Sequence, residues 1–226
     1  MDDQPARAGP YELRLLGGFL LLCGGRAVAV PASLQRIVAF LALRGPAPRR
    51  AAAGILWPST CDDRAMASLR TAVWRLRRMA SGLLVQSGEL LALDAAVQDD
   101  VHGADRTADA RRPCAELLPG WYDDWVIMDR ERLRHWHIRL LETAAAAAIE
   151  ESALDAALDW ALAAAAADPL RESAHRLVIA ALLADGNVGA ARRHLALVRD
   201  LFREQLGIAP SDQVAALFQK VAVTVR

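Results

Sequence analysis

The sequence predicts a mainly α-helical protein with a small β part, arranged in two domains. Hydrophobic residues make up 54% of the 226 residues, which is enough for folded cores, and much of that fraction is alanine, a strong helix former. Residues 10–95 hold eleven arginines against five carboxylates, whereas residues 96–226 hold fifteen basic against twenty acidic residues. This division of charge and the local patterns below predict a basic domain at 10–95 and an acidic domain at 100–226.

The first domain opens and closes with β signals. The run "LRLLGGFLLL" at 13–22 is two apolar segments broken by Gly17-Gly18, and "CGGRAVAVP" adds a third short strand that ends at Pro31. Small-residue turns between apolar runs are typical of β-hairpins. Ser87-Gly88 interrupts "GLLVQSGELLALD" at 82–94 in the same way, which predicts a second hairpin.

Three helices are predicted between these β segments. Ser33 is the expected N-cap of a helix through "LQRIVAFLALR", which "GPAP" at 45–48 brings to an end. A short helix, "RRAAAGILW", ends before Pro58, and a third helix covers about 62–80. A small sheet, three helices and a hairpin, in that order, predict a winged helix-turn-helix domain.

The second domain reads as helices throughout. Helical patterns run around 124–148, through "ALDAALDWALAAAAADPL", on both sides of Gly186-Asn187, and along "PSDQVAALFQKVAV". Ala157, Ala161, Ala164 and Pro169 fall near signature positions of the 34-residue tetratricopeptide repeat. We therefore expect tetratricopeptide-like helical hairpins, whose close helix contacts suit small residues.

The third helix of the first domain has two contrasting faces. Its stretch "RAMASLRTAVWRLRR" at 64–78 holds five arginines and no carboxylate. The inward stripe is predicted to consist of Leu69, Val73, Leu76 and Ala80, with Ala65 and Ala72 beside it. The outward set is predicted to consist of Ser68, Arg70, Thr71, Trp74, Arg75 and Arg78, with Arg77 at the boundary.

Two interpretations of this basic face stay open on the pattern alone. An α-helix fits the major groove of DNA, where arginine forms paired hydrogen bonds with guanine. A basic stretch is also often an ordinary solvated face. An ordinary exposed helix of this length, however, usually includes glutamates that pair with its arginines.

Several motifs resemble the Streptomyces antibiotic regulatory protein family over about residues 12–225. "LGGF" at 16–19, "LWP" at 56–58 and "SLRTAVWRLRR" at 68–78 resemble its DNA-binding domain. "ELLPGWYDDW" at 116–125, "RERLR" at 130–134, "DPLRESAHRLVIAALLADGN" at 168–187 and "LGIAPS" at 206–211 resemble its bacterial transcriptional activator domain. The resemblance implies a transcription factor, usually an activator, that binds direct repeats in double-stranded DNA upstream of promoters and recruits RNA polymerase.

The resemblance also implies roles for individual residues. Arg49 and Trp57 match phosphate-contacting positions, although Trp57 fits a core position equally well. Arg70, Thr71, Trp74 and Arg75 match major-groove positions, while Arg77 and Arg78 match positions that contact the backbone. Together with Ser68, these residues form the predicted DNA-binding set.

The predicted second hairpin, the wing, departs from the family pattern. It presents Glu89 near its tip and has no Arg or Lys from Met79 through Asp94. A carboxylate is unfavourable against the electronegative minor groove. The acidic wing and the net charge of zero also fit an alternative function, a protein-interaction scaffold whose winged helix does not bind DNA specifically.

Other functions find no support in the sequence. No nucleophile elbow, zinc motif or phosphate loop is present, so we predict no enzyme activity, no metal and no cofactor. Neither a signal-peptide pattern nor an apolar run of about 20 residues occurs, which predicts a cytoplasmic protein without a membrane partner. A homodimer on DNA is a further possibility, and the aromatic residues Trp121, Tyr122 and Trp125 are expected to clamp the two domains.

Overall fold

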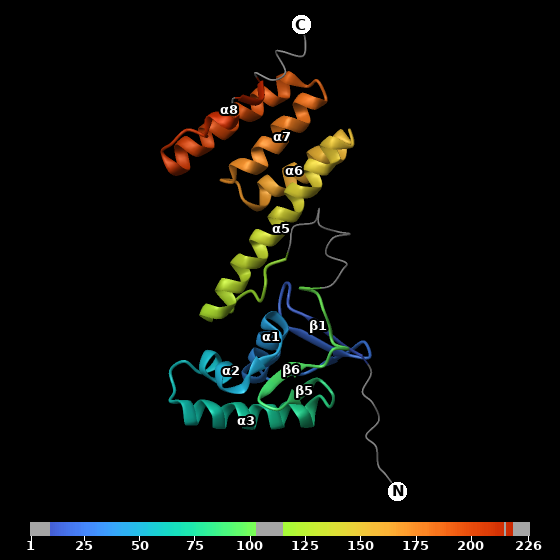
Figure 1. The fold of residues 1–226 in the computed structure, drawn as a ribbon, viewed down its shortest axis with the longest axis vertical. Helices are drawn as coiled ribbons and strands as arrows, with labels where there is room; N and C mark the ends of the chain where they lie inside the picture. The colour runs from blue at the N-terminus through green and yellow to red at the C-terminus, as the bar shows by residue number, and fades with distance from the viewer. Residues whose placement is uncertain (1–9, 103–114, 215, 219–226) are drawn as a thin grey trace. The chain divides into compact units, whose positions relative to one another are not determined.

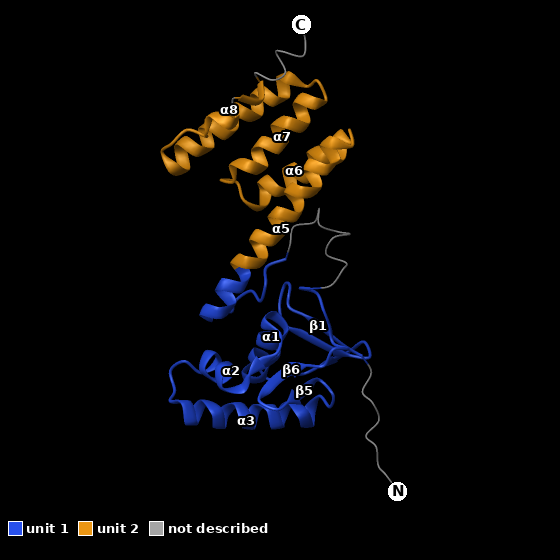
Figure 2. Ribbon diagram, in the orientation of Figure 1, with its two compact units in different colours: residues 1–106, 115–130 blue, residues 107–114, 131–226 orange. Residues whose placement is uncertain are grey.

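The computed structural model describes residues 10–102, 115–214 and 216–218 (Figure 1). Its contacts divide the chain into two compact units: unit 1 consists of residues 1–106 and 115–130, and unit 2 of residues 107–114 and 131–226 (Figure 2). Most of the predicted polar connector and the end of the last predicted helix lie outside the described residues. The predicted fold class is confirmed, because unit 2 is helical and the sheets belong to unit 1.

The sheet at the start of unit 1 has the strand order β3-β2-β1-β7. It comprises β1 (Tyr11–Arg14), β2 (Leu20–Cys23), β3 (Arg26–Val28) and β7 (Gln98–Asp99). The three predicted strands pair antiparallel, and Gly17 adopts a positive φ of 81° in the turn between the first two. Sequence patterns missed β7, which pairs parallel to β1, because two residues have no periodicity.

The winged helix-turn-helix follows in the predicted order. It consists of α1 (Ala32–Arg44), β4 (Ala47–Pro48), α2 (Arg49–Leu56), α3 (Asp62–Met79) and the wing hairpin of β5 (Leu84–Ser87) and β6 (Leu90–Leu93). The wing turns at Gly88 and Glu89, and β4 pairs with β6 on its other side. Ser33 was a wrong N-cap prediction, since α1 begins at Ala32 after Pro31 and has no side-chain cap.

Residues 115–130 complete unit 1 although they follow the wing by more than twenty positions. The backbone N–H of Leu118 donates to the carbonyl of Leu15 at 2.9 Å, and that of Gly17 donates to Glu116 at 2.8 Å. The Arg130 guanidinium donates to three carbonyl oxygens, those of Leu117, Leu118 and Trp121, at 3.0, 3.0 and 3.2 Å.

Ionic and aromatic contacts hold residues 115–130 against α1. The buried Asp129 carboxylate accepts a 2.8 Å hydrogen bond from Arg44 of α1. Trp125 meets Phe40 of α1 edge-on, with ring centroids 5.6 Å apart. Tyr122, by contrast, is 82% exposed, so its predicted part in the aromatic clamp was wrong; it precedes the first turn of α5 and projects away from the core.

Unit 2 contains the helical hairpins. Its helices are the main part of α5 (Asp124–Glu150), α6 (Leu154–Ala167), α7 (Glu172–Ala184) and α8 (Val188–Leu206), and residues 212–214 and 216–218 are also helical. Small side chains meet where the helices pack, as in the buried clusters of Ala145, Ala161 and Val178 and of Ala148, Ala157 and Ala181. Within the described ranges, no helix is long and apolar enough to cross a membrane.

A histidine pair links α7 to α8. The ring of buried His175 places Nε2 at 2.8 Å from the Pro169 carbonyl and Nδ1 at 3.1 Å from Nε2 of His194. Since a carbonyl can only accept, His175 donates through Nε2. When its ring is neutral, Nδ1 accepts and His194 donates the shared bond. Burial and the neighbouring His175 lower the pKa of His194, which favours the neutral form of the His194 ring.

We expect Trp125→Ala to lower the free energy of unfolding of unit 1 by about 3–5 kcal/mol, because it removes a buried aromatic side chain and leaves a cavity. Urea unfolding of the full chain measures this change. Tyr122→Ala is the matched control and should stay within about 0.5 kcal/mol of the parent. Equal losses in the two variants would contradict the assignment of residues 115–130 to the core of unit 1.

Candidate nucleic-acid interface

Packing fixes the rotation of α3 about its axis. The helix packs against α2 and also contacts α1 and β5, which lie on one side of it in Figure 1. Every residue of the predicted inward stripe is buried, namely Leu69, Val73, Leu76 and Ala80, and so are Ala65 and Ala72 beside it. The predicted outward residues are correspondingly exposed, except Ser68, which is half-buried.

The outer face of α3 is strongly basic. All five arginines of 64–78 are exposed, and within the described part of the chain none of them forms an ion pair with a carboxylate. Asp62 and Asp63 lie in the first turn and Arg77 and Arg78 in the last, where each sign of charge stabilises the helix dipole by about 0.3–1 kcal/mol. That contribution explains the terminal charges but not Arg70 and Arg75.

Two outward residues are already oriented by neighbours. Trp74 is 58% exposed, and the Arg78 guanidinium lies 4.9 Å from its ring centroid in a cation–π contact. The Thr71 hydroxyl donates to the carbonyl of Ala67 at 3.1 Å. Because its proton is used in this way, Thr71 presents an acceptor and a methyl group to a ligand.

Arg49 and Trp57 mark the two ends of α2. Arg49 is its first residue and is half-buried, while Trp57 is the C-cap and is also half-buried. The Trp57 backbone N–H donates to Ala53 at 3.0 Å, which closes the helix. Half-burial is compatible with both interpretations of Trp57, because an indole ring can pack while its edge stays accessible.

Sequence reasoning missed Gln86, which connects two of the predicted residues. Its Oε1 accepts from Nη1 of Arg49 at 3.0 Å and from Nη2 of Arg77 at 3.3 Å. The available signal was the alternation in β5: Gln86 lies two positions after buried Leu84 and therefore on the same face of the strand. Gln86 is exposed, so this alternation gives its face of the strand but does not by itself predict its two partners.

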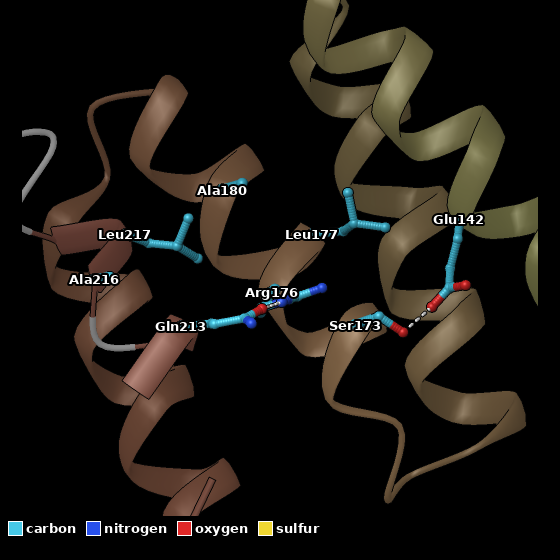
Figure 3. Close-up of a pocket in the computed structure, with 8 residues that line it drawn as sticks. All are labelled: Glu142, Ser173, Arg176, Leu177, Ala180, Gln213, Ala216 and Leu217. Atoms are coloured by element: carbon cyan, nitrogen blue, oxygen red, sulfur yellow. Dashed lines mark hydrogen bonds between the residues drawn. The ribbon is translucent and has the colours of Figure 1, made fainter. Parts of the chain in front are cut away.

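Unit 2 contains a separate cavity of about 520 Å³ between α5, α7 and the helical residues 212–214 and 216–218 (Figure 3). Glu142 at its edge accepts two 2.8 Å hydrogen bonds from Arg171 and one from Ser173. Burial raises the pKa of Glu142, but these hydrogen bonds and the arginine charges outweigh it and lower the pKa overall. Arg176 donates to Gln213 across the cavity. These polar groups thus already have partners, and α3 remains the better candidate site.

The described residues hold no group of three or more side chains suited to a metal ion. A winged helix with a basic third helix, followed by stacked helical hairpins, is the architecture of a transcriptional regulator. The model of the bacterial transcriptional activator domain matches residues 93–222. The chain belongs to this family and, within it, to the Streptomyces antibiotic regulatory proteins.

Comparisons with individual proteins agree with this assignment. The chain is 29% identical to the regulatory protein AfsR of Streptomyces coelicolor and 28% identical to that of Streptomyces griseus, over 95% and 96% of its length. It spans only 24% and 25% of those longer proteins. A structure of Mycobacterium tuberculosis EmbR, solved with a low-affinity phosphopeptide, has a TM-score of 0.75 at 19% identity. It matches 95% of this chain and 65% of EmbR, and it supports the fold.

For a chain that binds DNA through α3, a change of charge at the wing tip tests whether the wing lies near the duplex. We expect Glu89→Arg to tighten binding to a random-sequence 20-bp duplex by about 5- to 10-fold, the effect of roughly one added phosphate contact, as measured by fluorescence anisotropy. The matched control is Glu204→Arg on α8, which makes the same change of charge in unit 2. Equal affinities for the two variants would show that the wing tip lies away from the duplex.

Proposed function

We propose that the chain is a sequence-specific DNA-binding regulator that inserts α3 into the major groove of double-stranded DNA. Base edges are read by the exposed middle of α3, and phosphates are held by residues at its end and on α2, since phosphate contacts fix register and base contacts give specificity. The residues assigned to this interface are Arg49, Trp57, Ser68, Arg70, Thr71, Trp74, Arg75, Arg77 and Arg78.

One observation supports this function above all others. The arginines of α3 are exposed on a face whose rotation is fixed by a buried apolar stripe, and no carboxylate among the described residues pairs with them. An unpaired row of guanidinium groups on a rigid helix is suited to a polyanion of matching width.

The finer part of the proposal concerns activation. The chain binds direct repeats upstream of promoters as a homodimer, and unit 2 provides contacts between copies and with RNA polymerase. Support comes from the family, whose matching domain is described as a transcriptional activator domain, and from relatives named as regulatory proteins. The proposal assigns no reaction and no cofactor to the chain and places it in the cytoplasm, where the chromosomal DNA lies.

A protein-interaction scaffold is the second candidate. Glu89 at the wing tip and a formal net charge of zero weaken long-range attraction to DNA. Trp74, more than half exposed on α3, is the kind of aromatic residue that anchors protein interfaces. In that function the outer face of α3 binds an acidic protein surface.

Salt dependence separates the two functions. If about six phosphates are neutralised, a plot of log K against log salt concentration for a duplex DNA should have a slope near −5. Fluorescence anisotropy with the full chain, between roughly 50 and 200 mM salt, gives this slope. A flat plot, or no binding to any duplex, would overturn the DNA-binding function and leave the scaffold.

Arg75→Ala tests the proposed reading face. We expect it to weaken binding to a sequence selected in vitro with the parent chain by about 10- to 100-fold, because a paired arginine–guanine contact contributes roughly 1–3 kcal/mol. Arg26→Ala, which removes the same side chain from the exposed edge of β3, should leave the affinity unchanged. A footprint of Arg75→Ala on the selected sequence that matches the parent's, at the same protein concentrations, would refute the assigned reading face.

A further inference from the structure

Gln86 on the wing holds two arginines from different helices at one oxygen. Arg49 begins α2 and Arg77 lies in the last turn of α3, yet both donate to Oε1 of Gln86, at 3.0 and 3.3 Å. The Gln86 Nε2 group donates to the carbonyl of Gly88 at 3.2 Å, and this bond orients the amide. Arginine can only donate, so the amide oxygen and not the nitrogen must face the two guanidinium groups.

This arrangement concentrates positive charge. Both donor nitrogens reach the same oxygen, so the two distances limit their separation to at most 6.3 Å. No carboxylate in the described ranges forms an ion pair with either arginine. Two cations held together by a neutral acceptor repel each other, and an anion placed between them relieves that repulsion.

We infer that Arg49, Gln86 and Arg77 form a preorganised clamp for a single DNA phosphodiester, with Gln86 as its positioning residue. This inference rests on the proposed DNA-binding function. Each guanidinium keeps N–H groups beyond the one bound to Gln86, and these groups can form the short charge-assisted bonds that arginine makes with phosphate. The wing thus contributes to DNA binding through a neutral amide, although it has no cation of its own between Met79 and Asp94.

The wing backbone fixes the place of the clamp. The N–H of Arg49 donates to the carbonyl of Glu89 at 2.9 Å, so the start of α2 is tied to the wing turn. Arg49 is half-buried, which restricts its side chain further. A clamp whose members are held before binding loses less conformational entropy when the phosphate arrives.

Gln86→Glu is the sharpest variant, because it keeps the shape of the side chain but offers both arginines a competing carboxylate. We expect Gln86→Glu to weaken binding of the full chain to a random-sequence 20-bp duplex. Its salt slope should also fall in magnitude by about 1, the value for one lost phosphate contact. The matched control is Ser87→Glu, which adds the same charge one position along β5, on the opposite face of the strand.

A combined variant separates positioning from a general effect of charge or stability. In an Arg49→Ala/Arg77→Ala background, Gln86→Glu should change neither the affinity nor the slope any further. The thermal midpoint of each variant should match that of its parent, since Gln86 is exposed.

Three results would overturn the clamp without touching the proposed function. In the first, the parent chain binds DNA with a steep salt dependence, and Gln86→Glu keeps the parental salt slope. In the second, Ser87→Glu loses as much affinity as Gln86→Glu. In the third, Gln86→Glu weakens binding in the doubly substituted background as much as it does in the parent chain. A parent chain with no salt-dependent binding would instead refute the proposed function, and the clamp with it.

Discussion

The rotation of α3 about its own axis is the constraint on which the proposed interface depends. Fully burying a leucine stabilises a fold by about 1.5–3 kcal/mol, and Leu69 and Leu76 on the inner face of α3 are both fully buried. A turn of the helix large enough to bury Arg75 would expose these leucines and enclose an unpaired charge, at a cost of several kcal/mol. A single base contact contributes no more than that. Core packing therefore fixes which residues of α3 face outward, and any ligand of α3 must bind that outer face.

The same core extends beyond the winged helix. Residues 115–130 return to unit 1, where the Arg130 guanidinium satisfies three carbonyls of a non-helical stretch and Trp125 fills the space beside Phe40. Buried carbonyl groups without hydrogen-bond partners are costly, so the Arg130 side chain stabilises a stretch that lacks the regular backbone hydrogen bonds of a helix. Because the family match begins at residue 93, part of the matched region belongs structurally to unit 1.

Local patterns predicted most of the elements, and long-range contacts account for what they missed. The stripe of Leu69, Val73 and Leu76 has the period of a helix, so its burial could be foreseen from spacing alone. The strands β4 and β7 have two residues each, and only their distant partners make them strands. Tyr122 and Trp125 look alike in sequence, yet one is exposed and the other buried, because burial depends on where α5 begins. The predicted interface residues lie on α3 and at the two ends of α2, and their contacts with DNA stay a prediction.

Gln86 shows why the chemistry of a site can escape a search for charged residues. The wing has no cation from Met79 through Asp94, and that gap argued for a wing with little part in DNA binding. In the structure the wing instead orients cations that belong to α2 and α3. A neutral amide suits this task, since a carboxylate would cancel the charge and an aliphatic side chain would leave the guanidinium groups free to separate. The contribution of a wing to an electrostatic interface therefore depends on the charges it positions as well as on those it bears, and Glu89 at its tip does not by itself exclude the wing from that interface.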